Sequence, residues 1–396
     1  MTPFLRNNCK EILKINRAAP LSTIVLLLLM TIVVAPPASA GPGTTAAKIL
    51  NLGGGTRAAA LGDAFSAIND DVTAALWNPS GLGVMENRQA AISYVDRTQL
   101  FGEAGEGLYY AFFAGAMPLD DGGTLGTMLQ LEGQGTIDVT IDSPEPIRTE
   151  NLGTNWVWTV SYADKLAQGL FGGISGKVIS LKLGEEGARA YAIDLGVQYD
   201  LPSTPLPFPI QVGAAVQNWG TRIHFIDENQ SDPLPRMFRF GTAATLYNQG
   251  NHQVRLIGDL TASIHKLRED EEELEADLLQ LNETIKEENE KRLGEEQGLK
   301  PEITREGLLS DRGVGVNAFE WRHLQKSIGV EYWLGSFLAL RVGYKKEPGI
   351  DLLNFTDHLT YGLGVRLLNY QLDFAQLPGG GPERQRLNVF ALILQF

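Results

Sequence analysis

The alternation of apolar with small or polar side chains constrains the fold of this chain more than any other feature. From about residue 90 to the C-terminus the dominant period is two: Leu338, Leu340 and Val342 are apolar, whereas the residues between them are small or charged. This period is typical of strands, because successive side chains of a strand point to opposite faces. It predicts an all-β protein with strands at 90–97, 107–118, 123–133, 155–163, 169–183, 189–200, 209–217, 236–247, 251–263, 325–334, 336–346, 358–367, 369–376 and 386–396.

The connections between these fourteen predicted strands alternate in length. The long or polar ones are 98–106, 134–154, 218–235, 264–324, 347–357 and 377–385, and the short ones are 119–122, 164–168, 248–250, Gly335 and Leu368. Only 184–188 and 201–208 depart from the rule. Short turns at one rim and long loops at the other are typical of outer-membrane barrels, whereas a β-sandwich has no reason to alternate in this way.

The sequence therefore predicts a 14-stranded antiparallel transmembrane β-barrel over residues 90–396, with both termini on the periplasmic side. A further strand within 313–324 is left open. The barrel is expected in the outer membrane of a Gram-negative type of cell, in contact with outer-membrane lipid. Past the first forty residues no run reaches the ~20 apolar residues of a membrane-spanning helix, so a multi-helix transporter is excluded.

Residues 1–40 are predicted to be a signal peptide. Arg6, Lys10, Lys14 and Arg17 are basic, 21–34 is apolar, and Ala38-Ser39-Ala40 is a small-residue cleavage site. An uncleaved membrane anchor is the alternative. Cys9, the only cysteine, precedes the apolar run and so does not fit a lipoprotein signal. The net charge of −14 argues against a surface that binds nucleic acid.

One segment interrupts the period of two. Residues 264–312 are helical in composition, and apolar residues recur at Leu267, Leu274, Leu278, Leu281 and Ile285. The insert joins the ninth and tenth predicted strands, which places it in an extracellular loop. It is either a solvated amphipathic helix or a coiled coil that binds a partner.

The segment 41–89, between the leader and the first strand, has the most specific sequence. Glycines at 53–55 permit a tight turn, 58–68 can form a short helix with small side chains, and Asn69-Asp70-Asp71 can cap a second helix. Asn78-Pro79 would close that helix as a turn. The glycines are not a phosphate-binding loop, because no strand precedes them and no Gly-Lys-Ser/Thr follows.

These motifs resemble the start of the PorV/PorQ family, relatives of the FadL-type outer-membrane channels. The matching stretches are 55–58, 61–65, 70–71 and 78–82, with Ser80 in place of the family's usual Ala. Later, 329–333 with 340–344 is similar to the family's late hairpin, and 361–365 to its penultimate pair of strands. The helical insert at 264–312 is a departure from the family pattern.

The resemblance implies a barrel whose N-terminal helices fold into the lumen as a plug. The candidate plug residues are Arg57, Asp63, Asp70, Asp71, Asn78 and Pro79, with Asn78 and the aspartates holding hydrogen bonds in a polar lumen. The alternative is that they only cap helices. The terminal Phe390, Leu392, Leu394 and Phe396 are similar to the C-terminal signal that barrel-assembly machinery reads, and they form an apolar edge strand that must be paired.

Two functions follow from the resemblance. The favoured one is a PorV-like accessory or shuttle for exported proteins of the type IX kind, and the alternative is a FadL-like channel for hydrophobic small molecules. No cofactor, metal site or enzymatic activity is predicted, because the five histidines are dispersed and no Gly-x-Ser-x-Gly elbow is present. A lipase or protease site assembled across strands is left open.

Overall fold

A computed structural model describes residues 45–98, 106–120, 122–139, 147–202, 208–225, 231–264, 276, 278–289, 324–347, 355–378 and 386–396. The signal peptide predicted at 1–40 lies outside these residues, and so does the further strand considered at 313–324, except that Leu324 is the first residue of β12. No helix among them is long and apolar enough to cross a membrane.

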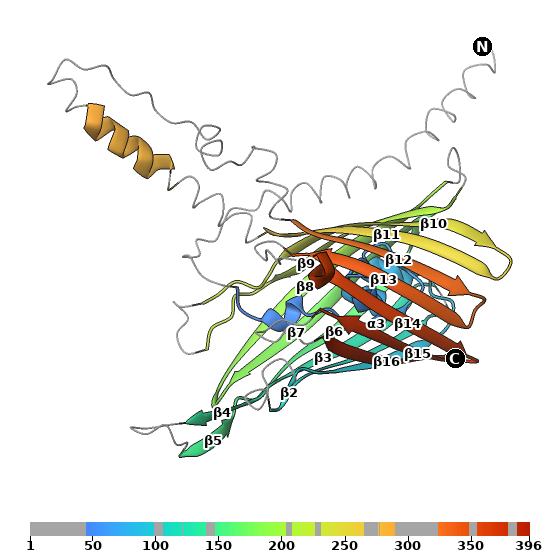
Figure 1. The fold of residues 1–396 in the computed structure, drawn as a ribbon, viewed down its shortest axis with the longest axis horizontal. Helices are drawn as coiled ribbons and strands as arrows, with labels where there is room; N and C mark the ends of the chain where they lie inside the picture. The colour runs from blue at the N-terminus through green and yellow to red at the C-terminus, as the bar shows by residue number, and fades with distance from the viewer. Residues whose placement is uncertain are drawn as a thin grey trace, which may run out of the picture. The chain divides into compact units, whose positions relative to one another are not determined.

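Fourteen strands close into an antiparallel barrel (Figure 1), which confirms the predicted fold class. The barrel strands are β1 (Gln89–Asp96), β2 (Leu108–Pro118), β3 (Thr124–Gln134), β6 (Thr154–Ala167), β7 (Leu170–Leu183), β8 (Glu186–Leu201), β9 (Ile210–Gly220), β10 (Met237–Gln249), β11 (His252–Ser263), β12 (Leu324–Leu334), β13 (Leu338–Lys346), β14 (Leu359–Leu367), β15 (Tyr370–Leu377) and β16 (Leu387–Gln395). Each strand pairs with its neighbours along the chain, and β16 pairs with β1 to close the ring.

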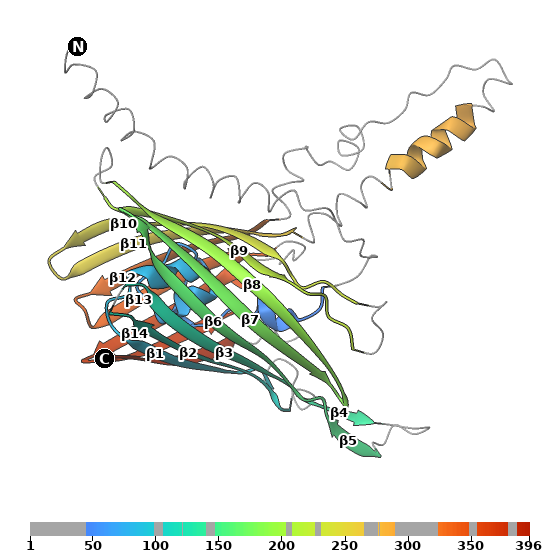
Figure 2. The same ribbon diagram turned by 180° about the vertical axis from the view of Figure 1, so that it is seen from behind.

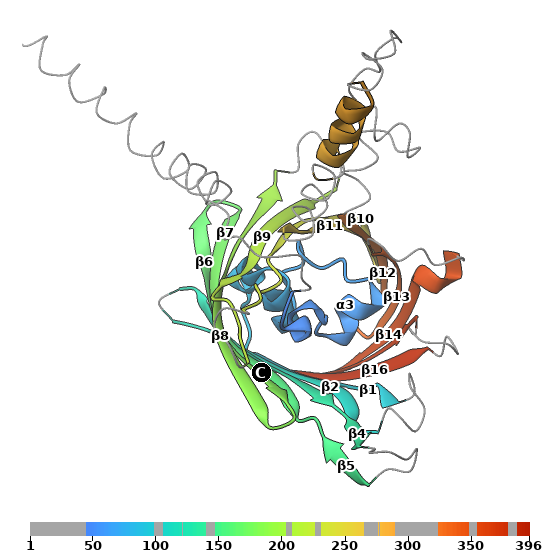
Figure 3. The ribbon, with the colours of Figure 1, turned by 90° about the vertical axis from the view of Figure 1, so that its left-hand side faces the viewer.

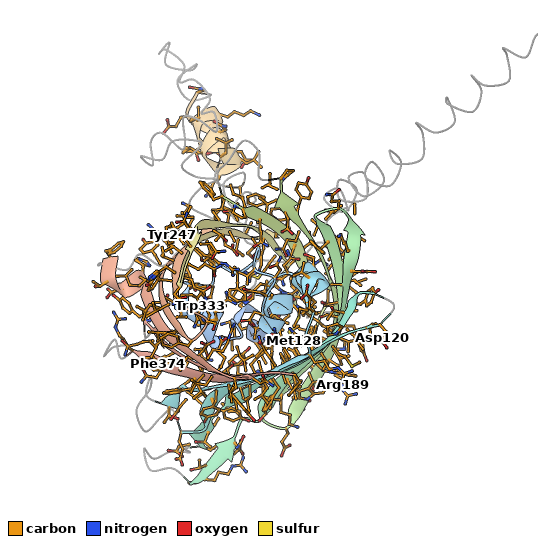
Figure 4. All side chains as sticks on the ribbon, turned by 90° about the vertical axis from the view of Figure 1, so that its right-hand side faces the viewer. Asp120, Met128, Arg189, Tyr247, Trp333 and Phe374 are labelled. Atoms are coloured by element: carbon orange, nitrogen blue, oxygen red, sulfur yellow. The ribbon has the colours of Figure 1, made fainter. Side chains whose placement is uncertain are left out.

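The two faces of the wall differ in chemistry as the alternation predicts. On β13, Leu340 and Val342 face outward and are each 47% exposed, whereas Arg341 faces inward and is 2% exposed. The end view in Figure 4 places Trp333 on the luminal side of the strands, and its side chain is buried. Closure leaves no unpaired strand edge. Together with the apolar outer face, this removes the need for water around the barrel.

The strands β4 (Thr136–Val139) and β5 (Arg148–Asn151) form a separate two-stranded sheet that the sequence does not predict. Backbone hydrogen bonds from Gln134 to Gly153 and from Leu152 to Gly135 connect this hairpin to the β3–β6 ladder. The hairpin therefore continues two barrel strands past the end of their ring (Figure 2). Four residues per strand are too few to show a clear alternation.

Residues 45–88, here called the luminal segment, lie within the ring of strands (Figure 3). Its elements are η2 (Lys48–Asn51), α3 (Thr56–Ala60), η3 (Val72–Leu76) and η4 (Pro79–Val84). Outside this segment, the short helix η8 (Phe355–His358) precedes β14. α3 contacts β13 to β16, and η4 contacts β6 to β8. The segment thus touches opposite sides of the inner wall.

The predicted helix over 58–68 is wrong in extent, because α3 ends at Ala60. Gly62 and Asp63 follow with φ of 67° and 65°, in the left-handed region. A Cβ on Gly62 would lie 2.8 Å from the backbone oxygen of Tyr344, so the chain turns where it meets β13. Tertiary contact, rather than local propensity, ends this helix.

Part of the predicted insert at 264–312 is described. Residues 276 and 278–289 are helical, and they include Leu278, Leu281 and Ile285. Leu267 and Leu274 lie outside the described residues. Whether the insert forms a coiled coil stays a prediction.

Candidate functional site

A bidentate salt bridge links the luminal segment to the wall. Arg57 on α3 donates from Nε to Glu331 Oε2 over 2.8 Å and from Nη2 to Glu331 Oε1 over 2.7 Å. Both side chains are buried. A two-pronged guanidinium–carboxylate pair fixes orientation as well as distance, so it sets the position of α3 against β12.

Glu331 belongs to a larger network of charges on the inner wall. Arg341 on β13 donates to Glu331 over 2.8 Å and to Asp373 on β15 over 2.8 Å. On the other side Arg57 donates to Asp70 over 2.8 Å, and Asp70 accepts a second hydrogen bond from Arg255 of β11 over 2.7 Å. The network balances charges of both signs, and all of its members except Asp70 and Arg255 are buried. Such balance is the condition for keeping ions in a buried place.

The network shifts the pKa values of ionisable groups in the luminal segment. Burial by itself would raise the pKa of Asp70, but Arg57 and Arg255 outweigh burial and hold that pKa well below its usual range. Burial would lower the pKa of Arg57, and the carboxylates of Asp70 and Glu331 reverse the effect and raise it. At Asp71 burial prevails over Arg57 and the bonds to Thr73, so its pKa is raised.

The predicted cap at Asp71 exists. Its Oδ1 accepts hydrogen bonds from the backbone nitrogen of Thr73 over 2.8 Å and from its hydroxyl over 2.7 Å, at the start of η3. Asp71 also lies 3.5 Å from Arg57. Asp71 therefore caps η3 and also lies beside Arg57 of α3.

Asp63 makes a second ionic link to the wall. Its Oδ2 lies 2.8 Å from the Nζ of Lys345 on β13, and Lys345 also pairs with Glu347. The backbone at Asp63 is in the left-handed region, with a φ of 65°. Asp63 thus fastens the turn that ends α3.

Asn78 joins the luminal segment to itself and to β8. Its Nδ2 donates to the backbone oxygens of Ser66 over 2.9 Å and Val197 over 3.1 Å. Its Oδ1 accepts from the backbone nitrogen and the hydroxyl of Ser80, which caps η4. Pro79 is the first residue of η4, where its missing N–H costs nothing.

Several wall residues that hold the luminal segment are not predicted from the sequence. Asp259 Oδ2 accepts hydrogen bonds from the backbone nitrogens of Phe65 over 3.0 Å and Ser66 over 2.8 Å. Gln198 donates to Ala67 and Gln217 donates to Leu76, each at a backbone oxygen. A usable signal was present, since each of these side chains is polar on the inward face of an alternating strand.

Inward-facing glycines let the luminal segment approach the wall. A Cβ on Gly173 would lie 2.4 Å from the backbone carbon of Pro79, and one on Gly213 would lie 2.1 Å from the oxygen of Ser66. On β13, a Cβ on Gly343 would lie 2.2 Å from the nitrogen of Gly62. The chain has 44 glycines because, in part, backbone meets backbone inside the barrel.

The outer wall carries an apolar hollow with a volume of about 490 Å³. Its floor is a row of three small outward residues, Ala90, Gly115 and Thr127, which pair across β1, β2 and β3. Larger side chains surround the row: Ile92, Phe113, Leu129, Trp158, Leu392 and Leu394. The Trp158 Nε1 donates to the Thr127 hydroxyl over 3.0 Å, so the polar atoms at the edge are satisfied.

The luminal segment lies directly behind this part of the wall. Gly55, Thr56 and Thr73 face Phe112 and Ala391 across a gap that has no room for a water molecule. The two sides share Ala91 and Ile92 of β1. A single layer of strands therefore separates the hollow on the outer face from the luminal segment.

The C-terminal residues occupy the closing strand. Phe390 and Phe396 are exposed on the outer face, and Leu392 and Leu394 border the hollow. β16 pairs with β1, so the edge strand is covered as expected. Its recognition by assembly machinery stays a prediction.

No group of three or more metal-ligating side chains occurs among the described residues. Of the five histidines, His252 shares a hydrogen bond of 2.7 Å with the Tyr332 hydroxyl, and His358 shares one of 2.9 Å with the backbone oxygen of Lys345. His265 and His323 lie outside the described residues.

No protein-family model and no curated protein sequence matches the chain. Its structure is similar to those of two toluene transporters. TbuX of Ralstonia pickettii is 14% identical with a TM-score of 0.47, over 87% of this chain and 98% of the transporter. TodX of Pseudomonas putida is 12% identical with a TM-score of 0.46, over 87% and 97%. A Pseudomonas aeruginosa FadL homologue is 10% identical with a TM-score of 0.41, over 86% and 97%.

The barrel fold is shown by the pairing of its own strands into a closed ring. The finer resemblance to the PorV/PorQ family stays a prediction, because these comparisons do not test it.

Proposed function

We propose that this protein is an outer-membrane barrel that takes up hydrophobic small molecules from the plane of the membrane. The observation that carries the proposal is the apolar hollow over Ala90, Gly115 and Thr127, which lies on the outer face of the wall and has the size of a small-molecule site. Hydrophobic solutes concentrate in the bilayer, so a binding surface on the outer wall meets them where they are most abundant.

The luminal segment complements this route. Its ion pairs with Glu331 and Lys345 and its contacts with wall glycines fill the ring, which disfavours an open axial pore. Passage would require the segment to shift behind β1, where one layer of strands, with Ala91 and Ile92 of β1 on the shared wall, separates it from the hollow. We propose that Arg57, Asp63, Asp70, Asp71, Asn78 and Pro79 hold the segment closed between such events.

The hollow can be filled without disturbing the fold. A Cβ on Gly115 meets nothing closer than Thr127 Cγ2 at 3.9 Å, so Gly115→Phe places a ring in the hollow. Gly176 on β7 is exposed and has nothing within 4 Å of its Cβ, so Gly176→Phe is the matched control. Uptake of radiolabelled toluene, dodecane and oleate is measured in cells that lack their own outer-membrane channel for such compounds.

We expect the wild type and Gly176→Phe to speed uptake of at least one compound several-fold, and Gly115→Phe to lose that gain. Equal amounts of folded barrel in the outer membrane must be verified for all three. If none of the three compounds enters faster with the wild type than with an empty vector, the proposal is wrong. Equal uptake by both variants would remove the hollow from the route.

An accessory role toward exported proteins, of the PorV/PorQ type, is the second candidate. The β4–β5 hairpin favours it, since this hairpin extends the β3–β6 ladder past the ring and offers strands outside the wall. Affinity purification of the tagged barrel from outer membranes tests this role. Recovery of exported proteins or secretion components, lost when 136–151 is shortened to a tight turn, would support it over the uptake role.

A further inference from the structure

A buried lysine on the inner wall is not used by the luminal segment. Lys177 of β7 is 5% exposed, and its neighbours Asp194 of β8 and Asn218 of β9 are each 1% exposed. The Nζ of Lys177 lies 2.7 Å from Asn218 Oδ1 and 2.7 Å from Asp194 Oδ2. An amine, an amide carbonyl and a carboxylate thus meet in one water-poor place, on three adjacent strands.

The amide of Asn218 is held in a fixed orientation. Its Nδ2 donates to the backbone oxygen of Pro235 over 2.8 Å, which leaves the carbonyl directed at Lys177. The backbone nitrogen of Asn218 donates to Asp194 Oδ1 over 2.8 Å. The other oxygen of Asp194, Oδ2, has no hydrogen-bond partner among the described residues, although it lies beside the amine. That oxygen is free to accept a proton.

The cluster sits where the sheet is interrupted. The β8–β9 register shifts between Ile193 and Leu195, so that Gln217 and Asn218 both lie opposite Asp194. Asn218 has a φ of 61°, the left-handed conformation of a residue in a β-bulge. Ladder hydrogen bonds between β8 and β9 are lost at the bulge, and a covalent link from β7 to β9 would hold the three strands together there.

We propose that Lys177 and Asn218 form an intramolecular isopeptide bond, with Asp194 as the proton carrier. Lysine is a competent nucleophile when its amine is neutral, and a buried ion pair can neutralise itself by proton transfer because the low-dielectric surroundings penalise charge. Fixing the amine against the carbonyl replaces a bimolecular encounter by an intramolecular one, which greatly accelerates such reactions.

The reaction balances without any further reagent. The Lys177 ammonium gives a proton to Asp194, and the neutral Nζ attacks Cγ of Asn218 to form a C–N bond. The bond between Cγ and Nδ2 then breaks, and the departing nitrogen takes the proton from Asp194 and the second proton of Nζ. The products are an amide between Nζ and Cγ, an ionised Asp194 and one ammonium ion.

Intact-mass spectrometry of the wild-type protein, purified from outer membranes and fully denatured, tests the proposal. We expect a mass lower than that of the processed sequence by one ammonia. Proteolysis should give a branched peptide that joins the segments around Lys177 and Asn218, with no cleavage after Lys177. An unshifted mass, or an ammonia loss that tandem spectra place elsewhere, overturns the proposal.

Substitutions at Lys177, Asn218 and Asp194 test the role of each residue in the reaction. Lys177→Met should abolish the ammonia loss, whereas Lys182→Met, a change of an exposed lysine on the same strand, should retain it. Asn218→Asp should lose water in place of ammonia, because the leaving group changes from nitrogen to oxygen. Asp194→Asn should leave a linear chain if the carboxylate carries the proton, and a branched one if it does not. The wild-type mass decides the central question even if a variant fails to fold.

Discussion

Arg57 and Glu331 are 274 positions apart in the sequence, yet they form a two-pronged salt bridge with N–O distances of 2.7 and 2.8 Å. The pair joins the first α-helix of the described chain to the twelfth strand. Because Glu331 also holds Arg341, one carboxylate serves two buried guanidinium groups. Glu331 therefore links the luminal segment to the buried charges of the inner wall.

Removing the charge of Glu331 should destabilise the barrel. Glu331→Gln keeps the side-chain size but leaves Arg57 and Arg341 with an uncompensated buried charge, a change that typically costs about 3–5 kcal/mol. The free energy of unfolding in urea, measured in detergent micelles by tryptophan fluorescence, checks this. Glu186→Gln, at an exposed position on β8, is the control and should stay within about 0.5 kcal/mol of the wild type. Equal stability of the two variants would contradict the role of Glu331.

The attachment of the luminal segment should weaken in acid through Asp70. Its folded-state pKa is held below that of the unfolded chain by Arg57 and Arg255, after burial has acted in the opposite direction. The ionised group therefore stabilises the fold above the unfolded pKa of about 3.9, and this contribution is lost as pH falls below about 4. Protease cleavage of the luminal segment, followed between neutral pH and pH 3 with an acid-active protease, measures the loss.

Asp70→Asn should be more easily cleaved at neutral pH and should show a weaker further change in acid. Asp71→Asn retains an oxygen that can cap Thr73, and it should keep the acid transition because Asp70 still titrates. An unaltered acid transition in Asp70→Asn would show that another group controls it.

Gly173 should not tolerate a side chain. A Cβ there would lie 2.4 Å from the backbone of Pro79 and Ser80, which cannot move aside as a flexible side chain could. Gly173→Ala should cost at least about 1–3 kcal/mol, as overpacking of a filled interior does. Gly176→Ala, three residues along the same strand with open space at its Cβ, should be close to neutral. Thermal unfolding of the two variants under one condition makes the comparison.

Asn78 should be sensitive to the loss of its donor. Asn78→Asp retains the oxygen that caps Ser80, but it brings an acceptor against the backbone oxygens of Ser66 and Val197. Burying these unpaired acceptors should cost about 1–3 kcal/mol, with more if the carboxylate stays ionised. Equilibrium unfolding and protease access at the luminal segment report the effect. A variant as stable as the wild type would show that the cap, rather than the link to β8, is what matters.

The strands were predictable because the barrel has two chemically different faces. Each predicted strand corresponds to an observed one, and the ends differ by at most four residues, as at Ala167 of β6. Such ends depend on turn geometry, which side-chain alternation does not encode. The β4–β5 hairpin was missed for a related reason, since its short strands have no buried face to impose a period.

The luminal segment shows what local sequence patterns can predict and what they cannot. The cap at Asp71 could be predicted, because a capping side chain bonds to a backbone two residues away. Asn78-Pro79 was expected to close a helix as a turn, whereas Asn78 caps the next helix, η4. The left-handed turn at Gly62-Asp63 could not, since it arises where the chain meets β13. Polar residues on the inward faces of the strands were visible, but their partners were not.

By itself, then, the sequence determined the number of barrel strands, which face of each is apolar, and where the helix after Asp71 could begin. Only the tertiary structure decided that Glu331 receives Arg57, that Asp259 receives the backbone of Phe65 and Ser66, and that glycines of the wall lie against the luminal segment. The physical reason is the separation along the chain over which each effect acts. Alternation and capping act between residues a few positions apart, whereas a buried charge is satisfied by whichever opposite charge barrel closure brings beside it.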